Sequence, residues 1–522
     1  MKNAPSSIEL LEPRIAPATL VGNVLTYTDI DGDLVKVAFT KATMDPGDFA
    51  FSTGTANDGV DTPRTLTGID LSGNIGGGFI LTATPKTGKG DSQANVGAII
   101  SDTDIGTVKV DGDVAAMGGF ANPNVKSFTA LSMGVVNPAN GTSASYLGSV
   151  GTFAVKGSVV SVALNFSSSV KSLSIGGNFG AATSSTFANI GGTVGSFKVA
   201  GSIIGKDLSV VVHGAVGAFS VGGSIVGGKD DLPSGAYQVD LSSAKSISVG
   251  GDLRGGAGVG GGSIIVGGTV ASVKIGGSMI GAGDKNRSAS FIGANVGSFT
   301  IGHDLVSNLF GGTASENGTI SLSGNLGSLK IGGDIIAGAV TSSGYFPATI
   351  SAKGTIGSLS VGGSILGVAA HPIYILAGGF GAAPGATAIK SFTVKHNVEF
   401  ARIVAGYEGI GTTFTQRNTD AGIGSISIGG NLTGTQIDIG STPGSDEPGT
   451  SNDLLIPTSL ARLDSIKIGG ALTGIAGDPT TYYVQAPVIK KATIGKATYS
   501  GAQLQGYVDL NAIGKAAIGG LA

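Results

Sequence analysis

Short apolar–polar alternations recur along most of the chain, and pairs of glycine interrupt them. In the stretch 355–367, "TIGSLSVGGSILG", Leu359 and Val361 are apolar, Ser360 between them is polar, and Gly362–Gly363 ends the run. Alternation over so few residues is typical of β-strands, and paired glycines disfavour helices. We therefore expect two or three short strands in each copy, joined at corners where glycine adopts backbone angles that other residues enter at a penalty.

Copies of this phrase fill residues 101–522 at spacings of 20 to 40 residues. A repeat in this range is typical of solenoids and propellers, but a propeller blade needs about 40 residues or more. The sequence therefore predicts an all-β fold, a parallel β-helix (β-solenoid) of about sixteen coils, with a β-propeller as the alternative. The copies are anchored at Thr107, Ser127, Thr152, Ser172, Ser196, Ala218, Ser246, Ser272, Ser298, Ser328, Ser358, Ser391, Ser425, Ser465, Lys491 and Lys515.

Stacking the copies in register would place equivalent apolar residues one above another inside the fold. Coils joined by parallel strand pairing lie about 4.8 Å apart, so these side chains would touch along the whole array. One predicted ladder consists of Phe153, Leu173, Phe197, Phe219, Ile247, Val273, Phe299, Leu329, Leu359, Phe392, Ile426 and Ile466.

The pattern divides the chain into an N-terminal segment (1–19), a small β domain or cap (20–100) and the solenoid with variable inserts (101–522). Alternation on either side of Asp31–Gly32 predicts a β-hairpin. Further strands are expected within 48–53, 64–73 and 78–84. At the other end, "KAAIGGLA" closes on a copy of the phrase without a capping sequence, which predicts an open strand edge.

Composition excludes several classes of protein. Glycine supplies 93 of 522 residues, yet 41% of the chain is hydrophobic and 12% is charged, which favours a folded chain over a disordered one. A net charge of −3 gives no basic surface for nucleic acid, and zero cysteines exclude disulfides, zinc ribbons and thiol catalysis. The uncharged stretches 255–273 and 367–389 lack the apolar bulk of a membrane-spanning helix, so no transmembrane segment is expected.

The stretch "DIDGD" carries the candidate metal ligands Asp29, Asp31 and Asp33. It resembles the opening of an oxygen-rich calcium loop, although an EF-hand would have Glu at the position of Thr40. A hairpin turn with flanking acids is the other interpretation. The hairpin turn is the favoured interpretation, so no cofactor is predicted, and calcium at these three acids is the alternative.

No catalytic residue is predicted. The four histidines do not lie beside a serine or an acid in a triad-like spacing. Carbohydrate lyases and hydrolases built on β-helices need paired acids on one sheet face, and the acid pairs of this chain fall in inserts or turns. The residues considered are His213, His303, His371, His396, Asp230, Asp231, Asp446 and Glu447, together with Asp111 and Asp113, whose "VDGDV" is predicted to have the same turn chemistry as "DIDGD".

The N-terminal stretch "ELLEPRIAPA" resembles the LEPR-motif family of bacterial proteins. The matching residues are Leu11, Glu12, Pro13 and Arg14, whereas Ala16 and Pro17 depart from the leucine pair that follows in the family. The resemblance covers about ten residues. It implies an exported, repetitive surface protein, similar in style to glycine-rich β-solenoid adhesins, and implies nothing about chemistry.

The expected function is a non-enzymatic structural or adhesive protein at the cell surface or outside a bacterial cell. Its expected partners are copies of itself, joined end to end, other surface proteins, or glycans. The inserts after Gly367, Gly434 and Gly474 are the expected recognition loops. The alternative is a carbohydrate-active β-helix enzyme, a polysaccharide lyase or hydrolase, with a cleft lined by acids from consecutive coils.

Overall fold

The described part of the chain is all-β. The computed structural model describes residues 17–520 except for 55, 58, 60–61, 86–89, 137–142, 206, 229–237, 257–260, 282–287, 308–316, 339–348, 411–412, 444–446, 479, 505 and 510–514. Within these residues the elements are strands and two 3₁₀ turns, with no α-helix. The LEPR-like residues 11–14 lie outside the described residues. The chain forms two compact units, residues 1–177 and 178–522.

Unit 1–177 begins with antiparallel strands and continues with parallel ones. The hairpin predicted at Asp31–Gly32 joins β2 to β3, and β3 pairs antiparallel with β6. From β7 onward each strand pairs parallel with an earlier one. The bounds are β1 (Thr19–Val21), β2 (Val24–Thr28), β3 (Asp33–Thr40), η1 (Pro46–Asp48), β4 (Phe49–Phe51), β5 (Leu66–Asp70), β6 (Gly77–Pro85), β7 (Val96–Ile100), β8 (Ile105–Gly118), β9 (Val125–Met133), β10 (Ser143–Leu147), β11 (Val150–Val155), β12 (Val162–Phe166) and β13 (Val170–Ile175).

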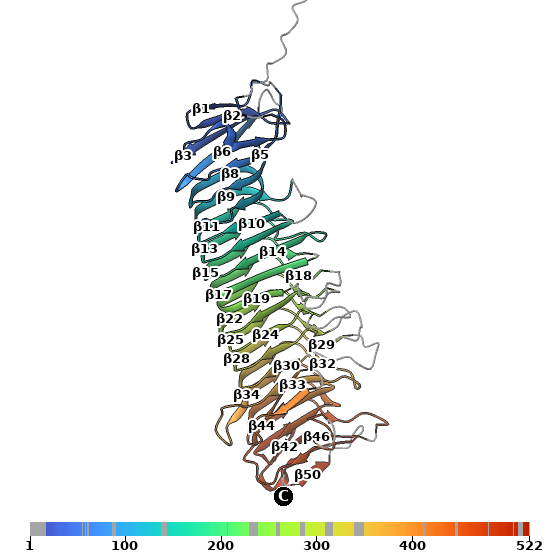
Figure 1. The fold of residues 1–522 in the computed structure, drawn as a ribbon. Helices are drawn as coiled ribbons and strands as arrows, with labels where there is room; N and C mark the ends of the chain where they lie inside the picture. The colour runs from blue at the N-terminus through green and yellow to red at the C-terminus, as the bar shows by residue number, and fades with distance from the viewer. Residues whose placement is uncertain are drawn as a thin grey trace, which may run out of the picture. The chain divides into compact units, whose positions relative to one another are not determined.

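Unit 178–522 is built from three stacks of parallel strands (Figure 1). The first stack holds the repeated phrase and pairs in the order β15 (Val194–Val199), β17 (Asp207–Val221), β19 (Gln238–Val249), β22 (Val270–Ile275), β25 (Val296–Ile301), β28 (Leu326–Ile331), β31 (Ile356–Val361), β34 (Thr387–Val394), β39 (Gly422–Ile428), β44 (Arg462–Ile468) and β48 (Lys491–Ile494).

The second stack consists of very short strands that follow the glycine pairs. It runs through β16 (Ile203–Ile204), β18 (Ile225–Val226), β20 (Leu253–Arg254), β23 (Met279–Ile280), β26 (Leu305–Ser307), β29 (Ile335–Ala337), β32 (Ile365–Leu366), β35 (Val398–Glu399), β40 (Leu432–Thr433) and β45 (Leu472–Thr473).

The third stack follows the inserts. It runs through β14 (Ser185–Ile190), the first halves of β17 and β19, β21 (Ser263–Val266), β24 (Phe291–Gly293), β27 (Ile320–Leu322), β30 (Thr349–Ala352), β33 (Ile373–Ala377), β36 (Ala401–Ala405), β41 (Gln436–Ile439), β46 (Thr481–Gln485) and β51 (Lys515–Gly520).

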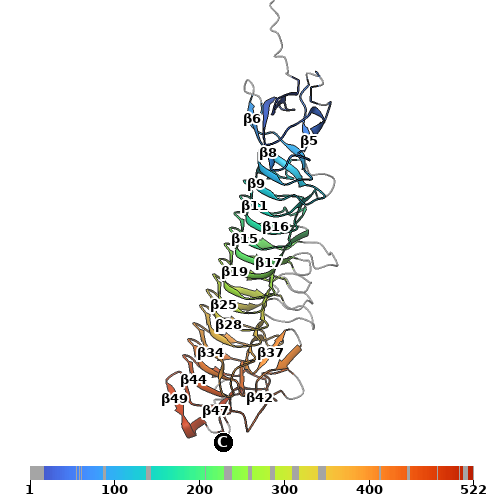
Figure 2. The same ribbon diagram turned by 60° about the vertical axis from the view of Figure 1, so that its left-hand side comes forward.

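The predicted apolar ladder is confirmed in both units. Phe197 pairs with Phe219 and Phe219 with Ile247, and the pairing continues through each predicted residue to Ile466. Figure 2 shows strands that carry these residues, among them β15, β17, β19, β25 and β28, one after another along unit 178–522. In unit 1–177, Phe153 pairs with Leu173. These side chains are at most 2% exposed, and the rings of Phe197 and Phe219 lie 5.1 Å apart. Burial of such side chains is the main favourable term for the stacks.

The glycine pairs are needed for a reason that the sequence prediction missed. We expected unusual backbone angles, but none of the stacked corner glycines has a positive φ. A Cβ added at Gly302 or at Gly332 would instead lie 2.0 Å from the carbonyl oxygen of the corner below it. The corners of successive coils approach so closely that a side chain does not fit between them.

A ladder of hydrogen bonds follows the same corners, and we call it the polar ladder. The corners are glycine pairs except at Ala200–Gly201, Gly302–His303 and Lys395–His396. The residue after each corner is polar until the last copy, and its side chain accepts a hydrogen bond from the backbone N–H of the equivalent residue in the next copy of the repeat. Ten such bonds, of 2.5 to 3.4 Å, join Asn178, Ser202, Ser224, Asp252, Ser278, Asp304, Asp334, Ser364, Asn397, Asn431 and Ala471 in order.

The C-terminal end differs from the prediction in two respects. Lys515 pairs with Thr481 in the third stack, so the last copy of the phrase is not a member of the first stack. The last strands of the first and third stacks are also not open edges: β48 pairs antiparallel with β49 (Ala497–Ser500), and β51 pairs antiparallel with β50 (Gly506–Asp509). Short antiparallel strands at a sheet edge hinder further strand addition. The remaining elements here are β47 (Val488–Ile489) and η2 (Gly501–Leu504).

Candidate functional site

The hairpin between β2 and β3 brings three carboxylates together. Asp29, Asp31 and Asp33 each offer an oxygen, and these oxygens all lie within 4.8 Å of one another. The Asp29 carboxylate accepts hydrogen bonds from the backbone N–H groups of Gly32 (3.1 Å) and Asp33 (2.8 Å), which fixes the turn. All three candidate metal ligands therefore face one point.

These carboxylates have different surroundings. Asp29 and Asp33 are buried, whereas Asp31 is exposed. Burial, together with a hydrogen bond to the Asp31 carboxyl group, raises the pKa of Asp29 to about 7. The same hydrogen bond lowers the pKa of Asp31. Carboxylates this close disfavour each other's ionisation, so a positive counter-charge is needed to keep all of them ionised.

The second Asp-Gly-Asp stretch does not form the predicted turn. Asp111 and Asp113 lie within the continuous strand β8, at a bulge in its pairing with β9. Asp113 is 1% exposed, and its carboxylate accepts hydrogen bonds from the Ser132 hydroxyl (2.5 Å) and the N–H groups of Val135 (3.1 Å) and Val136 (3.3 Å). The hydrogen-bonding needs of the buried Asp113 carboxylate are therefore met by the protein itself.

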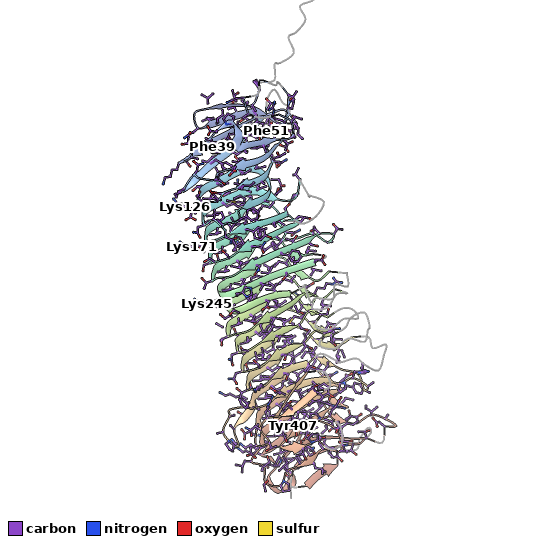
Figure 3. All side chains as sticks on the ribbon, viewed as in Figure 1. Phe39, Phe51, Lys126, Lys171, Lys245 and Tyr407 are labelled. Carbon is purple, nitrogen blue, oxygen red and sulfur yellow. The ribbon has the colours of Figure 1, made fainter. Side chains whose placement is uncertain are left out.

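In unit 178–522 the outer face of the third stack is covered near its C-terminal end. Strands β33 and β41 are buried at every position, so they have neighbours on both sides. The cover over β33 and β36 is the antiparallel hairpin of β37 (Tyr407–Ile410) and β38 (Thr413–Gln416). Its Tyr407 (Figure 3) packs with Tyr374, Leu376 and Val404 in a small outer core, which Phe414 completes.

The hairpin also roofs a groove of about 650 Å³ over the third stack. The floor comes from β21, β24, β27 and β30, and the wall comes from β37 and β38. The Gly409 N–H donates to the Ser351 hydroxyl (3.1 Å), which fixes the hairpin to β30. At its base, Arg417 Nε donates to Glu408 Oε1 (2.7 Å). The lining includes Ile265, Gly267, Ile292, Ser323, Lys353 and Thr415.

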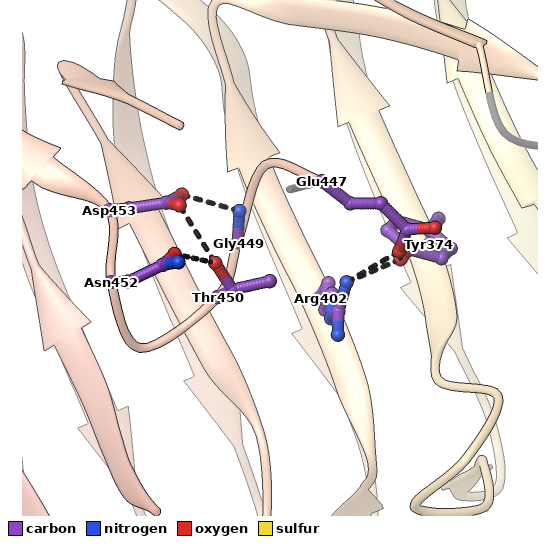
Figure 4. Close-up of polar contacts among 7 residues, drawn as sticks. All are labelled: Tyr374, Arg402, Glu447, Gly449, Thr450, Asn452 and Asp453. Carbon is purple, nitrogen blue, oxygen red and sulfur yellow. Dashed lines mark hydrogen bonds and ion pairs between the residues drawn. The ribbon is translucent and has the colours of Figure 1, made fainter. Parts of the chain in front are cut away.

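A second cavity, of about 290 Å³, lies beside an aromatic–ionic cluster in which Tyr374 is buried and Arg402 and Glu447 are partly exposed. Figure 4 shows Glu447 accepting hydrogen bonds from Tyr374 and from Arg402, whose Nη1 is 2.8 Å from Glu447 Oε2. Arg402 also donates to the Tyr374 hydroxyl (2.6 Å). Burial raises the pKa of Tyr374 well above its ordinary value, so its hydroxyl stays protonated. Asp478 and Tyr482, joined by a 2.8 Å hydrogen bond, line the same cavity.

Two further acids, Asp438 and Asp453, are buried near the loop that carries Glu447, between β41 and β44. Asp438 on β41 is 2% exposed and accepts hydrogen bonds from the Ser441 hydroxyl (2.6 Å) and from Gln485 Nε2 (3.0 Å). Asp453 accepts from the Gly449 N–H (2.6 Å), as Figure 4 shows. Burial, with a hydrogen bond between the two carboxyl groups, raises the pKa of Asp438 well above its ordinary value. The hydrogen bond between Asp438 and Asp453 joins the loop to the third stack.

The structure distributes the other sequence candidates widely. Asp230, Asp231 and Asp446 lie outside the described residues. Glu447 belongs to the cluster with Tyr374 and Arg402, a role that its position in an insert did not predict. The histidines are exposed at 213, 303 and 396 and partly exposed at 371.

Sequence reasoning missed the buried acids Asp438 and Asp453, although one signal was present. In the third stack the outward slot passes from Ser351 to Leu376 and then to Val404 before it reaches Asp438. Apolar residues in an outward slot indicate that another segment must cover that face. The signal therefore predicts a covered face but does not identify the cover.

Comparisons with known proteins add no identity. No family model matches the chain, and no similar curated protein or solved structure was found. Within the described residues, no helix has the length and apolar character required to cross a membrane.

Proposed function

We propose that the chain is a non-enzymatic, exported β-solenoid that serves a structural or adhesive function at the cell surface. In this proposal the three stacks of unit 178–522 are the three faces of a parallel β-helix. Within unit 1–177, the antiparallel strands of residues 19–85 cap the parallel strands that follow them. The chain passes through the stacks in a fixed order, as from β28 to β29, β30 and then β31, which supports a helical path. The LEPR-like residues support export.

The observation that carries this proposal is the polar ladder. Its side chains recur at one position of the repeat, and each one is engaged with the backbone of the next copy. A reaction centre needs polar groups that are free to contact substrate. The side chains of the polar ladder instead join one copy of the repeat to the next, as a structural element requires.

The buried acids support the same conclusion. A carbohydrate-active β-helix enzyme, the alternative, needs acids in an open cleft. In the described residues, Asp438 on the third stack and Asp453 in the loop above it are 2% and 6% exposed and hydrogen-bonded to the protein. In this proposal the two acids attach the loop above them to the third stack by hydrogen bonds.

The groove under β37 and β38 is the recognition site in this proposal, and glycans are its ligands. It crosses four successive strands of the third stack, as an extended chain would. Serine and threonine hydroxyls with Lys353 and Glu408 supply the few oriented polar groups that a binding site needs, beside apolar Ile265 and Ile292. End-to-end association has less support, because β49 and β50 occupy the last strand edges.

Binding of the purified chain to immobilised acidic and neutral polysaccharides tests this proposal. Gly267→Arg fills the groove without strain, since a Cβ there meets its nearest atom at 3.4 Å. We expect this variant to lose at least about tenfold in affinity, as burial of an unpaired charge or steric exclusion does in small sites. Gly47→Arg is the matched control, because a Cβ at this exposed position meets nothing within 4 Å.

Two results would refute the proposal. New reducing ends or unsaturated products in the polysaccharide would establish an enzyme. Absence of polysaccharide binding, combined with a strictly monomeric mass in light scattering at all concentrations, would remove both the glycan and the self-association partners.

A further inference from the structure

Unsatisfied polar atoms are concentrated at the hairpin of β2 and β3. In the part of the chain that the structure describes, five buried side-chain atoms have no hydrogen-bond partner, and four of them belong to Tyr27, Thr28 and Asp33. Both carboxylate oxygens of Asp33 are among them, and this side chain is 0% exposed. A buried carboxylate without a partner is costly unless a positive charge neutralises it.

Gly90 and Asp91 lie against these acids. Gly90 has a φ of +98°, and a Cβ added to it would lie 1.8 Å from Asp33 Oδ1. The next residue, Asp91, donates its backbone N–H to Asp31 Oδ2 (3.2 Å). Only glycine fits at position 90, so the backbone here is shaped around the acids.

The two Asp-Gly-Asp stretches make the contrast clear. Asp113 is as buried as Asp33, but the protein supplies it with hydrogen bonds from Ser132, Val135 and Val136. Asp33 has no such donor among the described residues, and its oxygens lie close to those of Asp29 and Asp31. A partner for Asp33 would therefore have to be positively charged and to bind the carboxylates of Asp29 and Asp31 as well.

We propose that Asp29, Asp31 and Asp33 bind one calcium ion, which locks the N-terminal hairpin against the segment at Gly90. Calcium takes oxygen ligands at about 2.3–2.6 Å, so two ligands on one ion lie at most about 5 Å apart. The observed limit of 4.8 Å fits this geometry. A cavity of about 270 Å³ beside Asp29, Asp31 and Asp91 has room for the waters that complete the coordination. Magnesium is disfavoured because it demands a stricter octahedral geometry.

Terbium luminescence on the full chain tests the site directly. Terbium replaces calcium at oxygen sites, and an excited tyrosine close to it sensitises its emission. The chain has no tryptophan, and buried Tyr27 lies at the site beside Asp29. We expect saturable emission that calcium displaces and magnesium displaces at least about tenfold less well, and a melting temperature that calcium raises and chelator lowers.

Three variants complete the experiment. Asp31→Asn changes an exposed residue, so it should fold, and it should weaken terbium binding at least about tenfold by removing one charged ligand. Tyr27→Phe should lower the emission while calcium still raises the melting temperature. Asp111→Asn, in the other Asp-Gly-Asp stretch, should leave both readouts unchanged. Equal emission from wild type and Asp31→Asn, or a melting temperature indifferent to calcium and chelator, would overturn the proposal and assign the counter-charge to the protein itself.

Discussion

At the residue scale, the feature that most constrains this chain is the space above each corner glycine. Stacked corners place the carbonyl oxygen of one coil where the next coil would carry a Cβ, as at Gly302 and Gly332. The second glycine of each pair faces the polar ladder in the same way: a Cβ at Gly333 would lie 2.0 Å from Asp304 Oδ1. Glycine is thus required by the contact between coils.

Gly332→Ala tests this constraint. The added methyl group must push apart two corners, because it would lie 2.0 Å from the Gly302 carbonyl oxygen. We expect the free energy of unfolding, measured with urea, to fall by about 1–3 kcal/mol, as for overpacked sites. Gly267→Ala is the control within the same unit, since its Cβ meets nothing closer than 3.4 Å and should change stability by less than about 0.5 kcal/mol. Equal losses in the two variants would contradict the explanation.

At the scale of elements, the third stack shows how an inserted segment buries strand residues that would otherwise face solvent. On β21 and β24 the outward residues Ile265 and Ile292 are partly exposed. Strands β33, β36 and β41 instead carry Leu376, Val404 and Asp438 outward beneath other segments. The hairpin of β37 and β38 covers the first two, and the loop held by Asp453 covers the third. Burial beneath this loop raises the pKa of Asp438 above the value that an exposed aspartate would have.

The buried acid pair makes unit 178–522 sensitive to pH. The pKa of Asp438 is raised in the folded chain above its ordinary value of 3.8, so the folded state holds a proton that the unfolded state has lost. Stability should therefore fall as pH rises from about 4 through the raised pKa, with a slope of up to about 1.4 kcal/mol per pH unit. Urea unfolding of Asp438→Asn, compared with wild type across pH 4–8, should show this dependence reduced. Parallel curves for the two proteins would contradict it.

Local features were predictable from the sequence, whereas contacts between distant segments were not. The hairpin at Asp31–Gly32 was predicted because its turn signal lies within a few residues. The apolar ladder followed from the period of the phrase. The pairing of Asp438 with Asp453, and the closure of Gly90 over Asp33, depend on where inserts fold back, which no period encodes.

At the scale of the whole molecule, register is the property that the repeat maintains. In unit 178–522 equivalent slots are joined at a fixed separation in several successive coils: Asn295 to Asn325 and Asn325 to Thr355 are each 30 residues apart. Inserts of different length enter between the second and third stacks, as before β19 and β30, and between the third and first stacks, as with β37 and β38. In both places the strand pairing on either side of the insert is kept. Coils should therefore be removable as units.

Deletion of 296–325 tests this modularity. The deletion joins Asn295 to Leu326, which occupies the slot that Val296 held, and so preserves the register. We expect a folded protein with an unchanged far-UV circular dichroism shape and cooperative thermal unfolding. Deletion of 296–326, one residue longer, puts Lys330 in the inward slot of Phe299 and should abolish folding, because a one-residue slip exchanges inner and outer side chains. Equal folding of both deletions would show that register is not specified.

The polar ladder has a direction. In each bond the accepting side chain belongs to the earlier coil and the donating N–H to the later one, as from Asp304 to Asp334 and from Asp334 to Ser364. A finished coil therefore presents a ready acceptor to whatever part of the chain emerges next during synthesis. Assembly can follow the order of translation, each turn acting as the template for its successor.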